Sequence, residues 1–101
     1  MIQVSTRPHI YFVIHDWMIR RLYLRGEKLN TFAYIYNLSK MGGKVTWEDI
    51  CKTFDVAPRT ARERLKNLFN EGLLKRKLSR SKALYWVDVD LIHKKAFIVE
   101  V

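Results

Sequence analysis

The side chains that could do chemistry in this sequence are mostly cations, and they are concentrated in one region. Nine of the nineteen Lys and Arg residues fall between Arg59 and Lys82, a stretch that contains two acidic residues, Glu63 and Glu71. Over all 101 residues, these nineteen cations stand against ten Asp and Glu, which leaves a formal net charge of +9. A charge of this size and position indicates a polyanionic partner, and nucleic acid is the first candidate.

Sequence patterns for catalysis or metal binding do not accompany these cations. His9, His15 and His93 are scattered, with no i, i+4 pair and no neighbouring cysteine, which argues against a metal site. Cys51 repeats with apolar residues at helical spacing and has no base beside it, so we interpret it as a core residue. The sequence contains no phosphate-binding loop and no nucleophile elbow. We therefore expect no enzymatic activity, no catalytic residue, no metal, no cofactor and no small-molecule ligand.

Length and composition restrict the class of protein. With 49% apolar residues in 101 positions, the chain can bury one core, which predicts a single domain rather than disorder. One cysteine cannot form an internal disulfide, and this favours a reducing compartment. No stretch approaches the roughly 18–20 apolar residues that a membrane span needs, and no signal-type segment begins the chain. We expect a cytoplasmic protein, associated with the nucleoid, or located in the host cytoplasm if it is viral.

The spacing of apolar residues predicts the helices that must position the cations. The repeat i, i+3, i+4, i+7 predicts helices over residues 27–40 and 47–54, and one apolar face predicts a further helix over 58–70. The residues that carry these patterns are Leu29, Phe32, Ala33 and Tyr36, then Trp47, Ile50, Cys51 and Phe54, then Ala61, Leu65, Leu68 and Phe69. Residues 46–49 fit a capping box, and Pro58 suits the first position of a helix.

The N-terminal part of the chain is predicted to be extended and then helical. Runs with β-branched and aromatic residues predict extended segments over residues 1–4 and 10–14. Asp16 can cap a helix from Trp17 to about Leu24, because its carboxylate can accept from the amides of the first turn. Gly26 suits the end of this helix.

A hairpin is predicted after the last of the central helices. Gly72 can take the left-handed conformation that ends this helix, and residues 73–78 then mix apolar and basic residues as a strand does. Residues 79–82 form a polar tip, and residues 83–89 alternate well enough for the returning strand. The tail, residues 96–101, is expected to form another strand.

Two helices, a three-residue turn and a basic hairpin are the order of elements in a winged helix-turn-helix. The chain resembles this family over about residues 27–89, in the runs 46–51, 54–62, 65–68 and 71–74. It is similar to small prokaryotic and viral transcriptional regulators, and to winged-helix domains of phage and plasmid replication initiators. The family usually has Ser or Thr where this chain has Ala57, which weakens the capping of the following helix.

The resemblance implies an α+β fold with three to four helices and a C-terminal β-hairpin wing. It implies a single domain over residues 1–101, with an N-terminal strand and helix extension (1–26), a winged helix-turn-helix (27–89) and a C-terminal strand (90–101). The implied partner is double-stranded DNA. The helix at about 58–70 would enter the major groove, and the wing, at residues 75–84, would lie on the backbone or in the minor groove.

The expected DNA-binding residues follow from these two elements. They are Arg59, Thr60, Arg62, Glu63 and Lys66 in the helix, and Lys75, Lys77, Arg80, Ser81 and Lys82 in the wing. Arg59 or Arg62 is expected to read a guanine, because an arginine can donate to both O6 and N7. Lys66, one turn further along, suits a phosphate. Arg80 suits a narrow minor groove.

A single small module buries little DNA surface, so we expect a homodimer on two half-sites. Surplus apolar residues either form its interface or enlarge the monomer core: Trp17, Ile19, Tyr23, Tyr34, Ile35, Leu38, Phe97 and Val99. The expected role is a transcriptional regulator. A DNA-binding module for replication initiation, replisome organisation or plasmid partition is an alternative, and a winged helix that binds a protein partner is another.

Overall fold

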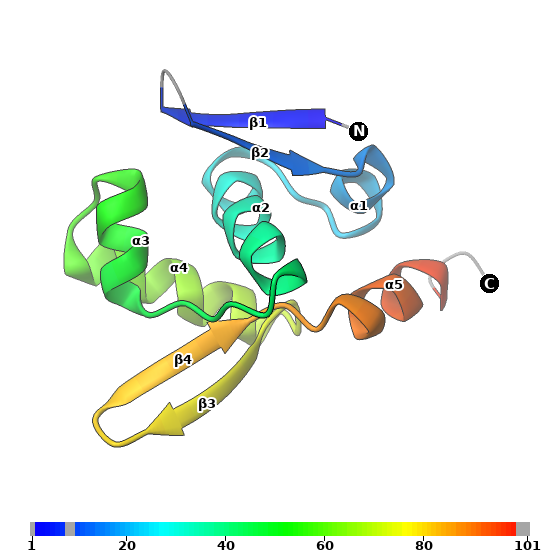
Figure 1. The fold of residues 1–101 in the computed structure, drawn as a ribbon. Helices are drawn as coiled ribbons and strands as arrows, with labels where there is room; N and C mark the ends of the chain where they lie inside the picture. Colours follow the sequence, from blue (N-terminus) through cyan, green and yellow to red (C-terminus); the bar gives the residue numbers. More distant parts are fainter. Residues whose placement is uncertain (1, 8–9, 99–101) are drawn as a thin grey trace.

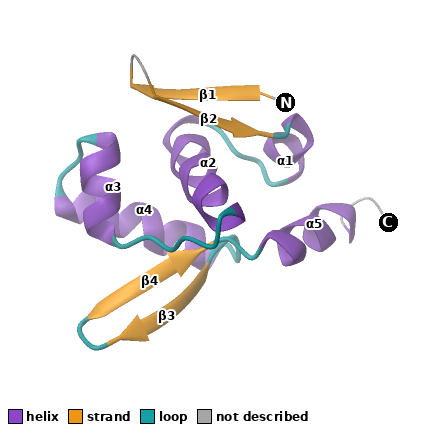
Figure 2. Cartoon of the chain, viewed as in Figure 1, coloured by secondary structure: helices purple, strands orange, loops and turns teal. Residues whose placement is uncertain are grey.

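Five helices and two antiparallel hairpins make up the part of the chain that this computed structural model describes, which is the backbone of residues 2–7 and 10–98 and the side chains of residues 14–93. The elements are β1 (Ile2–Arg7), β2 (Ile10–Ile14), α1 (Asp16–Arg21), α2 (Gly26–Lys40), α3 (Trp47–Phe54), α4 (Pro58–Asn70), β3 (Lys75–Ser79), β4 (Lys82–Trp86) and α5 (Val89–Ile98). Figure 1 traces them from the N-terminal hairpin to α5, and Figure 2 separates helices from strands. The predicted α+β class is confirmed.

Helix α2 lies at the centre of the molecule. The β1–β2 hairpin lies on one side of it, α4 and the β3–β4 hairpin lie on the other, and α3 lies beside it (Figure 1). Its side chains Phe32, Ala33, Ile35 and Tyr36 are buried. Such a wide buried face needs cover from several directions, because a surface helix buries a narrower stripe. The hairpin and the other helices provide this cover.

Most of the surplus apolar residues join this core. Ile35 is fully buried. Four others are partly buried and pack against the core: Trp17, Ile19, Tyr34 and Leu38. Tyr23 is 72% exposed. Phe97 and Val99 lie outside the described side chains. The enlarged monomer core is therefore the observed use of most of these residues.

Helix α3 begins with the predicted capping interaction and ends in a tight turn. The Thr46 backbone N–H donates to the Asp49 Oδ2 atom at 2.8 Å, which satisfies an amide at the helix start. Ile50 is fully buried and anchors the helix on the core. Asp55 ends it with a left-handed φ of 55°, a conformation that Asp tolerates better than most residues. The chain can therefore turn within three residues into α4.

Helix α4 confirms the predicted helix over residues 58–70. Pro58 occupies its first position, and Ala57 precedes it without a side-chain cap. Ala61, Leu65 and Leu68 are buried at helical spacing and hold one face on the core. The opposite face of α4, which carries Arg59, Arg62, Glu63 and Lys66, faces outward.

The β3–β4 hairpin follows Gly72, which takes the predicted left-handed φ of 78°. Its strands are antiparallel, and Ser79 pairs with Lys82 across a two-residue turn. Val45, before α3, joins the sheet through two backbone hydrogen bonds of 2.8 Å with Tyr85. This contact ties the base of the hairpin to the start of the helix pair.

Three predictions for the N-terminal helix are wrong. Asp16 does not cap α1, because His15 occupies the cap position and Asp16, inside the helix, forms an ion pair with Arg20 at 3.6 Å. The helix ends at Arg21 rather than near Leu24. Tyr23 adopts a φ of 55° and the Leu24 N–H donates to the Ile19 carbonyl at 2.9 Å, which is the arrangement of a Schellman motif. Gly26 begins α2 instead of ending α1.

The prediction of a C-terminal strand is also wrong. Residues 89–98 form α5, and residues 99–101 lie outside the described residues. The returning strand ends at Trp86, and α5 brings the described helices to five, against the three to four expected. The Asp88 Oδ1 atom accepts from the Leu91 N–H at 3.1 Å and starts the helix, and Ile92 is buried. Tertiary burial and this cap outweigh the β-propensity of the local sequence.

Candidate nucleic-acid interface

The outward face of α4 carries the side chains predicted to read DNA. Arg59, Arg62, Glu63 and Lys66 are exposed and Thr60 is half-buried, because the opposite face is held by the core. Arg59 Nε lies 3.4 Å from Glu63 Oε1, one turn along the helix. These two side chains are highly exposed, so the pair adds little stability. The structure therefore brings the predicted residues of this helix onto one surface.

Arg62 is held in place by Trp47, the first residue of α3. Its guanidinium carbon lies 4.5 Å from the centroid of the indole ring, a cation–π contact. A guanidinium stacked on a ring still presents N–H donors at its edge, and fewer rotamers remain to be lost on binding. Of the two arginines expected to read a guanine, Arg62 is thus the more pre-organised.

The β3–β4 hairpin projects beyond the helices and is exposed along its basic stretch (Figure 2). Every residue from 75 to 82 is exposed, including Lys75, Lys77 and Arg80. Arg80 lies in the turn with a left-handed φ of 55°. Arg76 differs from its neighbours because its guanidinium lies 4.2 Å from the Phe69 ring centroid, on α4.

A hollow of about 440 Å³ lies between the start of α3, the outward face of α4 and the β3–β4 hairpin. Aromatic side chains of Trp47, Phe69 and Tyr85 line it. Its cationic and polar lining comprises Arg62, Lys66, Asn70, Arg76, Ser81 and Lys82. Four of the predicted DNA-binding residues therefore meet here, while the others lie elsewhere: Arg59, Thr60, Glu63, Lys75, Lys77 and Arg80.

Lys82, near the tip of the hairpin, is joined to α3. Its Nζ atom lies 2.8 Å from Glu48 Oε1. The hydrogen bond from Lys82, with its positive charge, lowers the pKa of the Glu48 carboxyl, and the same hydrogen bond raises the pKa of Lys82. The pair is thus charged at neutral pH, and it places an acid among the cations of the hollow.

Sequence reasoning did not assign Trp47, Glu48 or Arg76 to the site. Trp47 was expected in the core, and Glu48 was part of the expected capping box. Their contacts join elements far apart in the chain, so no local spacing shows them. Side chains alternate between the two faces of a strand, so the sequence of β3 places Arg76 on the face opposite that of Lys75 and Lys77. This alternation is the one signal in the sequence that could have assigned Arg76 to the site.

On its far side, α4 is fixed to α2 by ion pairs. Arg64 is only 14% exposed, and its guanidinium lies 3.1 Å from Glu27 Oε1. Lys28 forms a second ion pair with Glu71, just after the end of α4. These contacts and the buried leucines hold the helix at a fixed orientation, which a reading helix requires.

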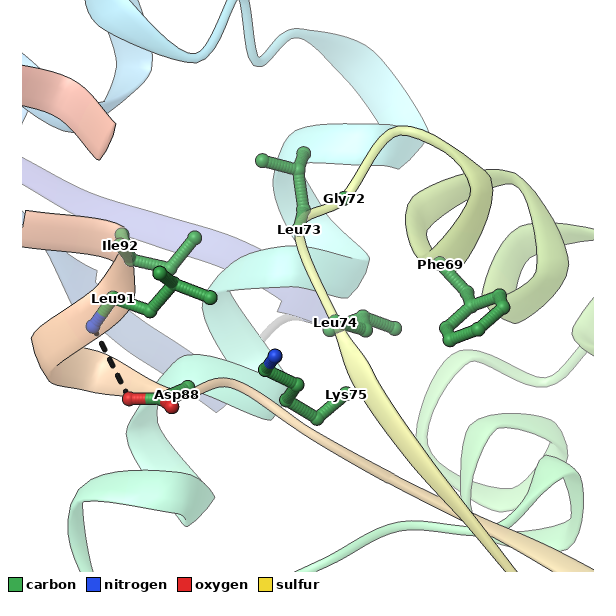
Figure 3. A pocket seen from close by; sticks show the side chains of 8 residues that line it. All are labelled: Phe69, Gly72, Leu73, Leu74, Lys75, Asp88, Leu91 and Ile92. Atoms are coloured by element: carbon green, nitrogen blue, oxygen red, sulfur yellow. Dashed lines mark hydrogen bonds between the residues drawn. The ribbon is translucent and has the colours of Figure 1, made fainter. Parts of the chain in front are cut away.

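A second hollow, of about 300 Å³, lies beside the base of the hairpin and the start of α5 (Figure 3). Leu73, Leu74, Leu91 and Ile92 give it an apolar lining. Asp88 is engaged in capping α5, as the dashed line in Figure 3 shows. Lys75 is the second ionisable side chain that the lining of this hollow contains.

Within the described part of the chain, no group of three or more His, Cys, Asp or Glu side chains could hold a metal ion. Among those same residues, no helix is both long enough and apolar enough to cross a membrane.

The sequence matches no known protein family and no curated protein. The structure resembles the homodimeric winged helix-turn-helix DNA-binding domain of a possible ArsR-family transcriptional regulator from Mycobacterium bovis, with a TM-score of 0.59 and 16% identity, over 82% of this chain and 75% of that one. It also resembles a MepR mutant from a multidrug-resistant Staphylococcus aureus clinical isolate, with a TM-score of 0.58 and 19% identity, over 84% of this chain and 64% of that one.

A possible transcriptional regulator from Methanosarcina mazei shares the fold over more of the chain. The TM-score is 0.59 and the identity 15%, over 97% of this chain and 87% of that one. At these identities the likeness defines the fold rather than the function. This chain has a winged helix-turn-helix fold, in which α3 and α4 are the helix pair and β3–β4 is the wing.

Proposed function

We propose that this protein binds double-stranded DNA and acts as a transcriptional regulator. The observation that carries the proposal is the cationic surface shared by α4 and the β3–β4 hairpin. Arg62, Lys66, Arg76 and Lys82 line one hollow there, and the neighbouring hairpin adds further exposed cations. A predominantly cationic helix face beside a cationic hairpin fits a groove flanked by phosphates.

In the proposed complex α4 lies in the major groove. Arg62, held on Trp47, donates to O6 and N7 of a guanine, with Arg59, Thr60 and Glu63 beside it on the outward face. Lys66 contacts a phosphate. In the hairpin, Lys75, Lys77, Ser81 and Lys82 contact the backbone, and Arg80 at the turn reaches the adjacent minor groove.

We further propose that the protein acts as a homodimer in the cytoplasm, on the nucleoid or on viral DNA in a host. One module of this size buries too little DNA for tight specific binding, so two half-sites are needed. The similar Mycobacterium bovis domain is homodimeric. The structural neighbours named above are regulators, and no observation favours replication, partition or a protein-interaction role over this one.

Selection of bound duplexes from a random pool tests the proposal. At about 0.15 M salt, nonspecific attraction is partly screened, and a regulator should enrich an inverted repeat with half-sites about one helical turn apart. Tandem copies would instead indicate a replication or partition protein. If the protein bound no duplex even at low salt, the result would contradict DNA binding. The remaining hypothesis would then be a winged helix that binds a protein partner.

A further inference from the structure

An exposed leucine stands within the basic stretch of the hairpin. Leu78, on β3, is 71% exposed, whereas the leucines that precede the strand, Leu73 and Leu74, are buried. The surrounding residues from 75 to 82 are exposed, and five of them are cations. An apolar side chain there gains little from the protein core, so burial of this side chain against a partner would add to the free energy of binding.

The register of the hairpin shows which way this leucine faces. Arg76 and Leu78 are two residues apart on β3 and therefore share one face, and Arg76 lies on the Phe69 ring of α4. Leu78 pairs with Ala83, which lines the hollow between α4 and the hairpin. Leu78 thus lies on the face toward α4, about 7 Å beyond Arg76 along the strand and close to the Arg80 turn.

We infer that Leu78 packs against the deoxyribose rings that line the minor groove next to the major groove entered by α4. The inference rests on the proposed DNA binding. Charge complementarity selects this occupant, because an apolar side chain that shares its strand face with Arg76 and lies next to the Arg80 turn needs a surface that is anionic around an apolar strip. Deoxyribose carbons between two rows of phosphates provide such a surface, and apolar side chains do enter minor grooves.

Leu78 therefore adds shape-dependent affinity that the cations alone do not provide. A variant that lacks one cation releases fewer counterions on binding, so its affinity depends less steeply on salt concentration. A variant that lacks the leucine keeps the same dependence on salt concentration. The two contributions can thus be measured separately on one hairpin.

The test compares Leu78→Ala with the unchanged protein on duplexes of about 30 base pairs, or three helical turns. One duplex carries the selected site and one has a mixed sequence. We expect Leu78→Ala to bind the selected duplex about tenfold more weakly, with an unchanged log–log salt slope. Hydroxyl-radical footprinting should show lost protection of sugars in the flanking minor groove, with the central major-groove site still occupied.

Two further variants serve as controls. Leu78→Met keeps an apolar side chain of similar size and should bind like the unchanged protein. Met41→Ala removes another exposed apolar residue, 78% exposed at the end of α2, and should have no effect on affinity. Circular dichroism establishes that each variant is folded.

Several results would overturn the inference. Equal affinity and equal footprints for Leu78→Ala and the unchanged protein would exclude a minor-groove contact. Sedimentation velocity without DNA compares the self-association of Leu78→Ala with that of the unchanged protein. A difference between them would show that the leucine contacts a second copy of the chain rather than DNA. If the unchanged protein bound neither duplex, the proposed function and this inference would fall together.

Discussion

Glu48 on α3 and Lys82 on β4 are joined by an ion pair, with Oε1 and Nζ 2.8 Å apart, and Lys82 also lines the hollow between α4 and the hairpin. The pair fixes the hairpin relative to the helix pair. The same ion pair engages Lys82, one of the cations proposed to contact phosphate. Positioning of the hairpin and phosphate affinity therefore depend on the same two side chains.

Glu48→Gln should increase affinity for duplex DNA of any sequence. The substitution releases Lys82 and removes an acid facing the phosphates, so the log–log salt slope should steepen by up to about 0.9. Fluorescence anisotropy at several salt concentrations measures the affinity and the salt slope. Glu27→Gln makes the same change of charge beside Arg64, on the far side of α4, and is the matched control. Weaker binding by Glu48→Gln would mean that hairpin positioning outweighs the lost repulsion.

The Glu48 carboxyl should titrate below its ordinary pKa of 4.5, because Lys82 donates to its charged form. A carboxyl with a lowered pKa stabilises the fold above its unfolded pKa and loses this contribution as the pH falls through the folded value. The pKa of Lys82 is raised, so its contribution to the stability of the fold is complete below its ordinary pKa of 10.5. This contribution is lost as the pH rises through the higher pKa of the folded state. The ion pair should thus persist across the neutral range.

Carboxyl chemical shifts measured by NMR during a pH titration test this expectation. In Lys82→Met, the Glu48 midpoint should move upward toward the ordinary value. An unchanged midpoint in that variant would show that Lys82 is not the cause of the lowered pKa.

Arg62→Ala should reduce discrimination between sequences, whereas Lys77→Ala should weaken binding to every duplex alike. A base contact contributes about 1–3 kcal/mol of discrimination, and a phosphate contact contributes about one unit of salt slope. Arg62→Lys keeps the charge but not the planar fork, and should lose discrimination as well. Competition binding with selected and scrambled duplexes measures the difference. Equal losses on both duplexes for all three variants would contradict the division between a reading helix and a positioning hairpin.

Ala57→Ser should stabilise the protein. Ala57 precedes α4 in extended backbone and provides no side-chain acceptor for the amides of the first turn. A serine hydroxyl there can accept one, which contributes about 0.5–2 kcal/mol. Chemical denaturation followed by circular dichroism gives the free energy of unfolding. Ala57→Val adds a side chain without an acceptor and should not stabilise; an equal gain for both variants would rule out capping as the cause.

Leu65→Ala should lower the free energy of unfolding by about 2–5 kcal/mol, because the buried side chain leaves a cavity between α4 and the core. Lys66→Ala, at the adjacent exposed position, should change it by less than about 0.5 kcal/mol. Denaturant titration of both variants measures the contrast. Similar effects from the two substitutions would contradict the assignment of the inward and outward faces of α4.

The central helices could be predicted because their signals are local. The burial of Ala61, Leu65 and Leu68 follows from their spacing, and Pro58 marks a helix start whatever the surroundings. The ends of the chain gave weaker signals. Residues 89–98 combine β-branched and aromatic types with polar ones, and their choice of helix depends on the burial of Ile92 and on the Asp88 cap.

The amino-acid sequence by itself determined the two helices of the helix-turn-helix, the basic hairpin and the outward face of α4, since spacing and charge within a few residues indicate these. The order of these elements carried the family resemblance that implied the class of fold. Only the tertiary structure decided that Arg62 lies on Trp47, that Arg76 lies on Phe69 and that Lys82 pairs with Glu48. Such contacts depend on how the elements cross and on which rotamers the packing permits. Local spacing predicts neither the crossing of the elements nor the rotamers, so the arrangement of the cations is defined only in the folded chain.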